Sequence, residues 1–305
     1  MPHSRTGTSA SDALYALAFG AARSVVVVGT AKNAGKTTTF NALCEVARER
    51  GVRIGVTSLG RDGEPYDAVD GAPKPRVRLA PGTIATIPAD LVAASAPLAT
   101  LERGAESALG RVLFVRALDE VTCEIGGPPS ARAMRATIAR LQALVDGPVL
   151  VDGAIDRIAP LAGGDDAVIV ATGAVSGETI DAVAAVAAET AARLRIPPHD
   201  AHERDERRVV RIAGAIDGRE AEALLARAAG ATVVVRDPTR IAVRGERFAR
   251  LMRAVDVRCE RPIRLVALTT SPVAGDVRLP ARELVEAVAR ATALPVFDVV
   301  ADVGA

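Results

Sequence analysis

The sequence is poor in aromatic residues, with no Trp, 2 Tyr and 5 Phe in 305 residues. Proteins that bind single-stranded nucleic acids use aromatic side chains on which bases stack, together with extended basic patches. This chain lacks both, because its 38 basic and 37 acidic residues are interspersed and give a formal net charge of +1. We therefore expect no nucleic-acid partner and a core built from Val, Ile, Leu and Ala.

Cysteines and long apolar runs are also scarce. Cys44, Cys123 and Cys259 are widely separated and form no C-x-x-C pair, which indicates reduced thiols and not a disulfide framework. No apolar run approaches the roughly 18 residues that cross a bilayer, and the first residues lack the pattern of a secretory signal. These absences predict a cytoplasmic protein with no membrane attachment.

Short apolar, β-branched segments alternate with amphipathic ones along the chain. Strands are expected at residues 24–29, 53–57, 77–87 (one or two strands), 112–117, 148–152, 167–171, 209–213, 232–235, 263–268 and 296–300. Helices are expected at residues 12–22, 37–50, 129–144, 178–194, 219–229, 246–254 and 281–293, with a further helix start at 91–95. This alternation predicts an α/β fold, a mostly parallel sheet with helices on both faces, of the P-loop NTPase type.

The polar, charged segment 197–208 is the best candidate for a linker or an exposed loop. It divides the chain into a P-loop nucleotide-binding core, residues 1–196, and a C-terminal α/β part, residues 209–305. The strands expected in the C-terminal part have the same apolar, β-branched composition as those of the core. We therefore expect them to continue the same sheet.

A glycine-rich motif, G-T-A-K-N-A-G-K-T-T, occupies residues 29–38 between a predicted strand and a predicted helix. Backbone N–H groups in such a turn converge on phosphate oxygens at the positive end of the helix. Lys36 is expected to reach the β- and γ-phosphates, and the Thr37 hydroxyl to bind Mg²⁺. The residues expected to hold the nucleotide are Gly29, Thr30, Lys32, Asn33, Ala34, Gly35, Lys36, Thr37 and Thr38.

Two positions depart from the usual pattern. Thr30 stands five residues before Gly35, where the standard motif has glycine, and Gly29 comes one residue earlier. Lys32 is four residues before Lys36, whereas the signature lysine of dimeric partitioning ATPases is five before. Lys32 is therefore either a phosphate ligand or, by base rates for charged loop residues, a solvated loop lysine.

The spacing of Gly29, Thr30, Gly35, Lys36 and Thr37 resembles dethiobiotin synthetase and the cobyrinic acid amide synthetases, whose loop reads G-T-x-x-x-x-G-K-T. More of the chain is similar to the P-loop subunit of the lysine 5,6-aminomutase reactivase. That resemblance extends over the glycine-rich loop, T-S-L-G-R-D-G-E at 57–64, D-G-A-I-D-R at 152–157 and the S-P at 271–272. It implies ATP and Mg²⁺ as cofactors, and the absence of an N-K-x-D guanine motif agrees with ATP.

Two carboxylates are candidates for the metal. Asp152 ends the apolar strand expected at 148–152, the form of a Walker B element, and the alternative is a cap or turn Asp. Asp62 follows the second strand, where the resemblance implies a metal-approaching carboxylate and the alternative is an Asp-Gly turn. The predicted catalytic residues are Lys36, Asp152 and Asp62, and the predicted metal ligands are Thr37, Asp62 and Asp152. The resemblance also places the nucleobase near residues 269–272.

Three functions remain open from the sequence. The first is an ATPase that acts on another protein; the resemblance implies an adenosylcobalamin-dependent aminomutase as partner, together with a second reactivase subunit, and a homodimer is a further expectation. The second is a dethiobiotin-synthetase-like ligase that uses ATP to activate a small carboxylate or amine; Lys32 is a candidate for its extra lysine, since the chain has only Lys32, Lys36 and Lys74. The third is a nucleotide sensor without turnover.

Overall fold

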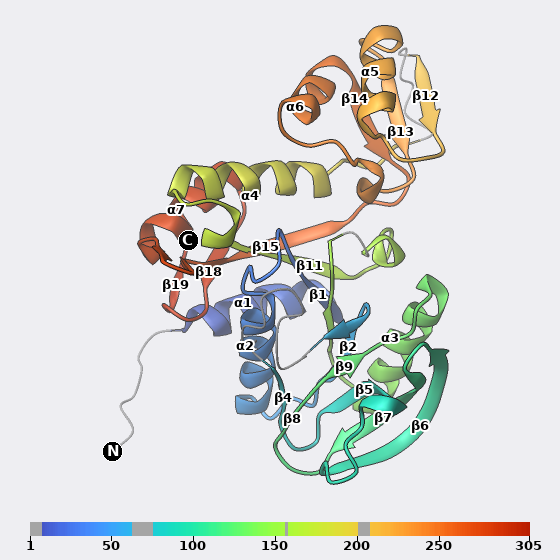
Figure 1. Cartoon of the computed structure of the whole chain (residues 1–305), viewed down its shortest axis with the longest axis vertical. Helices are drawn as coiled ribbons and strands as arrows, with labels where there is room; N and C mark the ends of the chain where they lie inside the picture. Colours follow the sequence, from blue (N-terminus) through green and yellow to red (C-terminus); the bar gives the residue numbers. More distant parts are fainter. Residues whose placement is uncertain (1–7, 63–75, 156–157, 201–207) are drawn as a thin grey trace.

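The computed structural model describes residues 8–62, 76–155, 158–200 and 208–305. The chain has an α/β fold in which a large, mostly parallel sheet is flanked by helices (Figure 1). Across the sheet the strands are β19 (Val303–Gly304), β18 (Val296–Asp298), β15 (Arg264–Ser271), β11 (Ala167–Gly173), β1 (Ser24–Gly29), β10 (Val149–Asp152), β2 (Gly55–Ser58), β5 (Ile84–Pro88), β7 (Gly110–Ala117) and β6 (Leu98–Ser107). The strands from β18 to β5 run parallel, and β19, β7 and β6 add antiparallel pairings at the two sides.

The helices cover both faces of this sheet, as the sequence pattern predicts. They are α1 (Ala10–Ala21), α2 (Lys36–Glu49), α3 (Ala131–Val145), α4 (Ile180–Leu194) and α7 (Ala281–Thr292). Alternate residues of β1 point to opposite faces: Val25 and Val27 pack with α1 and α2, whereas Val26 and Val28 pack with α3, α4 and α7. Because both faces are covered, β1 consists almost wholly of buried valines.

The order of strands places a crevice beside β1. The chain leaves β1 through α2 and enters β2 on one side, whereas it leaves β11 through α4 and reaches β15 on the other side. Such a reversal between two adjacent parallel strands opens a space at their carboxyl ends, where α/β proteins bind ligands. The glycine-rich loop follows β1 and therefore lies at this point of the sheet.

Helix ends follow local capping chemistry. α1 begins after Ser9, whose hydroxyl accepts the N–H of Asp12. Ser130 caps α3 by accepting the N–H of Ala133. The expected helix start at 91–95 is replaced by a short 3₁₀ turn, η1 (Ala89–Leu91), which connects β5 to the long hairpin of β6 and β7.

The C-terminal part does not lie in a single sheet. β15, β18 and β19 belong to the main sheet, but β12 (Val209–Ile212), β13 (Thr232–Val235) and β14 (Asp256–Cys259) form a separate three-stranded parallel sheet. Their apolar side chains pack with α5 (Gly218–Arg227) and α6 (Gly245–Ala254) in a core of their own. Figure 1 shows this insertion unit, residues 209–259, beyond α4 and away from the main sheet.

Short antiparallel pairs accompany the main sheet. β3 (Arg61–Asp62) pairs with β9 (Ile125–Gly126), β4 (Val77–Leu79) with β8 (Val121–Cys123), and β16 (Val273–Ala274) with β17 (Val277–Arg278). The remaining 3₁₀ turns are η2 (Ala159–Leu161), η3 (Ala174–Ser176) and η4 (Pro238–Arg240). Within the described ranges, no helix combines the length and apolar character that crossing a membrane requires.

Candidate functional site

The glycine-rich loop connects the carboxyl end of β1 to the first turn of α2. Two of its residues have left-handed backbone conformations, Asn33 with φ 62° and Gly35 with φ 91°. Asparagine and glycine are the residues that adopt this conformation at least cost. Lys32 and Asn33 are exposed, whereas Ala34 is buried and anchors the loop against the protein. The composition of the loop thus suits the sharp turn that it makes.

Gly35 is the N-cap residue of α2, and it has no side chain with which to cap the helix. The first backbone N–H groups of a helix have no intrahelical acceptors, and they need a partner from elsewhere. A side chain at position 35 would place its Cβ 3.1 Å from the Cβ of Ser271, besides requiring the unfavourable positive φ. The absence of a side chain therefore lets the loop lie close to the end of β15 and leaves the α2 N-terminus open to an anion.

Lys36 and Asp152 form an ion pair at this end of the sheet. The Lys36 Nζ lies 2.5 Å from the Asp152 Oδ1; the lysine side chain is 24% exposed and the aspartate 1%. Asp152 is the last residue of β10, which pairs with β1 in the register Val27 to Asp152. Two residues predicted from separate motifs, 116 positions apart in sequence, are thus brought into direct contact.

Thr30 ties the start of the loop to the neighbouring strand. Its N–H donates to the Ala171 carbonyl at 2.9 Å. Its hydroxyl donates to the Thr172 Oγ1 at 3.2 Å and lies 2.9 Å from the Ser176 Oγ. The threonine that replaces the usual glycine therefore connects the end of β1 to β11.

The late segment at residues 269–272 also lies beside the loop. The Thr269 hydroxyl is 2.8 Å from the Thr39 hydroxyl, which comes from the buried side of α2. Ser271 is the neighbour of Gly35, and on its other side it faces Gly173 at the end of β11. The ends of β1, β11 and β15 are therefore joined through hydroxyl contacts and close backbone approaches.

The sequence did not predict Thr172, Ser176 or Thr39 as members of the site. Their contacts join residues that are 142, 146 and 230 positions apart, which no local pattern reveals. The available signal was the position of Thr172, next to the end of a buried parallel strand. Strand ends of this type face the ligand crevice in open α/β sheets.

The structure describes the remaining predicted residues in less detail. Thr37 and Thr38 are partly exposed in the first turn of α2. Asp62 lies in β3, opposite Ile125 of β9, and the structure describes its backbone only. Gly63, Glu64, Asp156 and Arg157 of the segments that carry the resemblance lie outside the described residues.

The site holds few protein ligands for a metal. Among the residues that the structure describes, no group of three or more His, Cys, Asp or Glu side chains is arranged to bind an ion. Mg²⁺ bound with a nucleotide uses one or two protein groups, and phosphates and waters complete its octahedron. The buried Asp152 carboxylate and the Thr37 hydroxyl are the kind of oxygen ligands that such an ion takes.

Comparisons of the chain with protein-family models, with curated proteins and with solved structures gave no match.

Proposed function

We propose that the chain binds ATP as its Mg²⁺ complex at residues 29–38 and hydrolyses it in order to act on a partner protein. The observation that supports this best is the combination of an α2 N-terminus that begins at a glycine, which has no capping side chain, with the Lys36–Asp152 ion pair. An N-terminus without a side-chain cap offers N–H donors to phosphate oxygens, and a lysine beside it adds a positive charge. A buried carboxylate within reach of that lysine suits a metal-bound phosphate.

Each residue has a distinct proposed role. The backbone of residues 34–38 binds the phosphates, and Lys36 neutralises charge on the β- and γ-phosphates. Thr37 and Asp152 hold the metal, which supplies charge neutralisation of the transferred phosphoryl group when it is bound. Asp62 is proposed as a further metal or water-positioning carboxylate, and Thr30 keeps the loop in place through β11.

The partner is proposed from the sequence resemblance. It is an adenosylcobalamin-dependent aminomutase, approached together with a second reactivase subunit, and the ATPase cycle serves to exchange its damaged cofactor. A cytoplasmic location and a homodimer of this chain belong to the same proposal. The small-molecule ligase stays a competing prediction, and the same experiment separates the two.

The test is phosphate release from Mg-ATP by the full chain, with and without a cobalamin-loaded aminomutase. Lys36→Ala is expected to weaken ATP binding about tenfold to a hundredfold, because charged hydrogen bonds contribute about 1.5–3 kcal/mol. Lys32→Ala is the matched control in the same loop, since Lys32 is exposed while Lys36 contacts Asp152.

Phosphate release that the aminomutase stimulates, and that Lys36→Ala abolishes, would support the proposal. Turnover that is indifferent to the aminomutase but rises with a small carboxylate or amine would favour the ligase. Absence of ATP binding by the unmodified chain would overturn the nucleotide site itself.

A further inference from the structure

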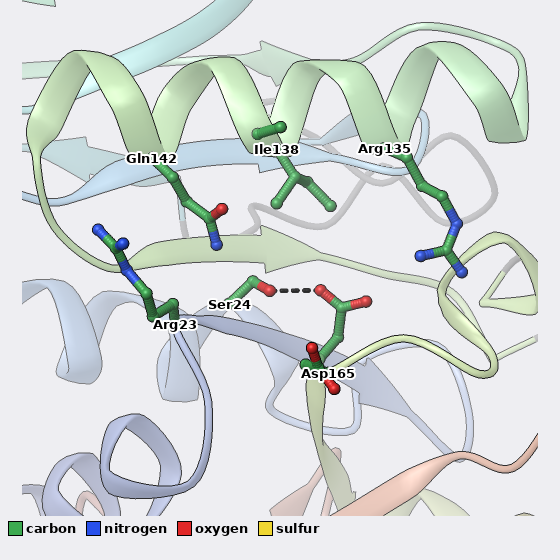
Figure 2. A pocket seen from close by; sticks show the side chains of 8 residues that line it. Arg23, Ser24, Arg135, Ile138, Gln142 and Asp165 are labelled. Atoms are coloured by element: carbon green, nitrogen blue, oxygen red, sulfur yellow. Dashed lines mark hydrogen bonds between the residues drawn. The ribbon is translucent and has the colours of Figure 1, made fainter.

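A second candidate site lies at the other end of the strands from the glycine-rich loop, at the amino ends of β1 and β11. A cavity of about 300 Å³ opens there between α3 and the segments that lead into the two strands (Figure 2). Arg23 and Ser24 line it from the start of β1, and Asp165 and Asp166 from the segment before β11. Because the glycine-rich loop follows the carboxyl end of β1, this cavity is separate from the proposed nucleotide site.

One face of α3 forms the third wall. Arg135, Ile138 and Gln142 are spaced three and four residues apart and therefore share a side of the helix. Figure 2 shows Gln142 near Arg23, Arg135 at the other end of the same face, and Ile138 between them. The wall is thus polar at both ends and apolar in the middle.

The end of the cavity that contains Asp165 and Asp166, the acidic end, is held in place by contacts within the protein. Asp166 is 9% exposed, and its carboxylate accepts a hydrogen bond from the Ser24 hydroxyl. Arg135 donates to the Ala162 carbonyl at 3.0 Å, so its guanidinium is fixed beside this end. Burial raises the pKa of Asp166, and the Ser24 hydrogen bond and the charge of Arg135 offset only part of that effect. A cation bound beside Asp166 would reduce the free-energy cost of keeping this buried carboxylate charged.

The charges are distributed unevenly between the two ends. Asp165 and Asp166 together outweigh the single guanidinium of Arg135, which leaves one net negative charge at that end. Arg23 and the Gln142 amide form an end that is positive and can donate hydrogen bonds. A ligand that matches both ends carries an ammonium group at one end and an acidic oxygen group at the other.

We propose that this cavity binds a small aliphatic zwitterion, an amino acid whose ammonium group faces Asp165 and Asp166 and whose carboxylate faces Arg23 and Gln142. Ile138 packs against the methylene chain between the two groups. The volume of about 300 Å³ is at the lower limit of ligand pockets, which suits a molecule of this size and excludes larger cofactors. The two aspartates also disfavour a phosphate, because like charges repel at short range.

Calorimetric titration of the full chain with 5-aminopentanoate tests this site. Pentanoate and pentylamine are the matched control ligands, because each lacks one of the two charged groups. Saturable binding of 5-aminopentanoate is expected, with both controls at least about tenfold weaker, as the loss of a charge-assisted hydrogen bond predicts. A series from glycine to 6-aminohexanoate then measures the distance between the two ends.

Four variants locate the binding. Arg23→Gln and Asp165→Asn change exposed side chains, so the fold is retained, and each is expected to weaken binding about fivefold, as for partly solvated ion pairs. Arg253→Gln alters an exposed arginine of the insertion unit and should leave binding unchanged. Lys36→Ala should also leave it unchanged, which separates this site from the nucleotide site.

Two results would overturn the proposal. One is the absence of saturable binding for every ω-amino acid of the series at millimolar concentration. The other is binding that Arg23→Gln and Asp165→Asn do not alter, or that pentanoate alone reproduces in full.

Discussion

The Lys36 ammonium and the Asp152 carboxylate lie 2.5 Å apart, at the ends of two neighbouring elements that converge on the same edge of the sheet. Lys36 opens α2, and Asp152 closes β10. A phosphate bound at the α2 N-terminus has to share the lysine with a buried carboxylate that is already in contact with it. In the proposed site, we therefore expect the ion pair to weaken the binding of a metal-free nucleotide, and a divalent cation beside Asp152 to reverse that effect.

Asp152→Asn is expected to strengthen the binding of ATP in the presence of EDTA and to abolish the gain from Mg²⁺. The variant removes a like charge near the phosphates and releases Lys36, an effect of about 1 kcal/mol, or about fivefold in affinity. Titration of a fluorescent ATP analogue with and without Mg²⁺ measures both quantities. Equal weakening under both conditions would show that Asp152 has only a structural role.

Gly173→Ala is expected to destabilise the protein strongly. A Cβ at this position would lie 2.1 Å from the Ser271 carbonyl oxygen, so β11 and β15 would have to separate at the loop. We expect the free energy of unfolding to fall by about 2–4 kcal/mol.

Gly20→Ala is the matched control for Gly173→Ala in the same denaturant titration. No atom lies within 4 Å of a Cβ at position 20, and alanine favours the helix α1. The variant should be neutral or more stable by up to about 1 kcal/mol. A neutral Gly173→Ala would mean that the strand ends are not packed as described.

The three cysteines are expected to resist alkylation in the folded protein. Burial raises the pKa of Cys44 to about 12, and that of Cys123 and Cys259 to about 11. At pH 8 the thiolate fraction is then on the order of one in a thousand or less, and the thiolate is the reactive form. Mass spectrometry after iodoacetamide treatment should find no adduct before unfolding and three after it. Rapid labelling of any one cysteine in the native state would contradict this.

Asp166 is expected to make stability depend on pH. Burial raises its pKa above the ordinary value of 3.8, so the folded state binds its proton more tightly than the unfolded state does. Stability from this group is greatest below that ordinary value and declines as the pH rises through the folded-state pKa. The free energy of unfolding of the parent relative to Asp166→Asn should therefore fall as the pH rises above the ordinary value of 3.8.

A second variant checks the cause of that pH dependence. The Ser24 hydroxyl donates to Asp166 and lowers its pKa, so Ser24→Ala should raise the pKa further and steepen the decline. A parent and an Asp166→Asn variant with parallel pH profiles would show that Asp166 titrates in the folded protein as it does in the unfolded chain.

The sequence predicted the elements whose local composition is decisive. β1 and β10 are short β-branched runs that only a two-sided sheet buries, and the helices repeat apolar residues at a helical period. The residues of β6 escaped prediction because L-A-T-L-E-R-G-A-E-S lies on the edge of the sheet, half exposed, with charged residues at irregular intervals. An edge strand that is half exposed buries little apolar surface, so its sequence shows only a weak alternation of apolar and polar residues.

Sheet membership could not be predicted for the C-terminal part. β13 and β15 both contain apolar and β-branched residues, yet one lies in the insertion unit and the other in the main sheet. Which sheet a strand joins is decided by its pairing partners, and these are distant in sequence. For the same reason Lys36 and Asp152 were predicted one at a time, while the hydroxyl contacts of Thr30 were not predicted at all.

The segment that precedes the insertion unit, residues 197–199, pairs with Cys259 at the end of the unit. The His199 N–H donates to the Cys259 carbonyl at 2.8 Å, and the Cys259 N–H donates to the Pro197 carbonyl at 2.9 Å. β15 begins shortly after Cys259 and is eight residues and about 26 Å long. Its far end, at Ser271, lies next to Gly35. β15 therefore connects the insertion unit directly to the turn that is proposed to bind phosphate, and a partner that binds the insertion unit would act on that turn from the opposite end of one strand.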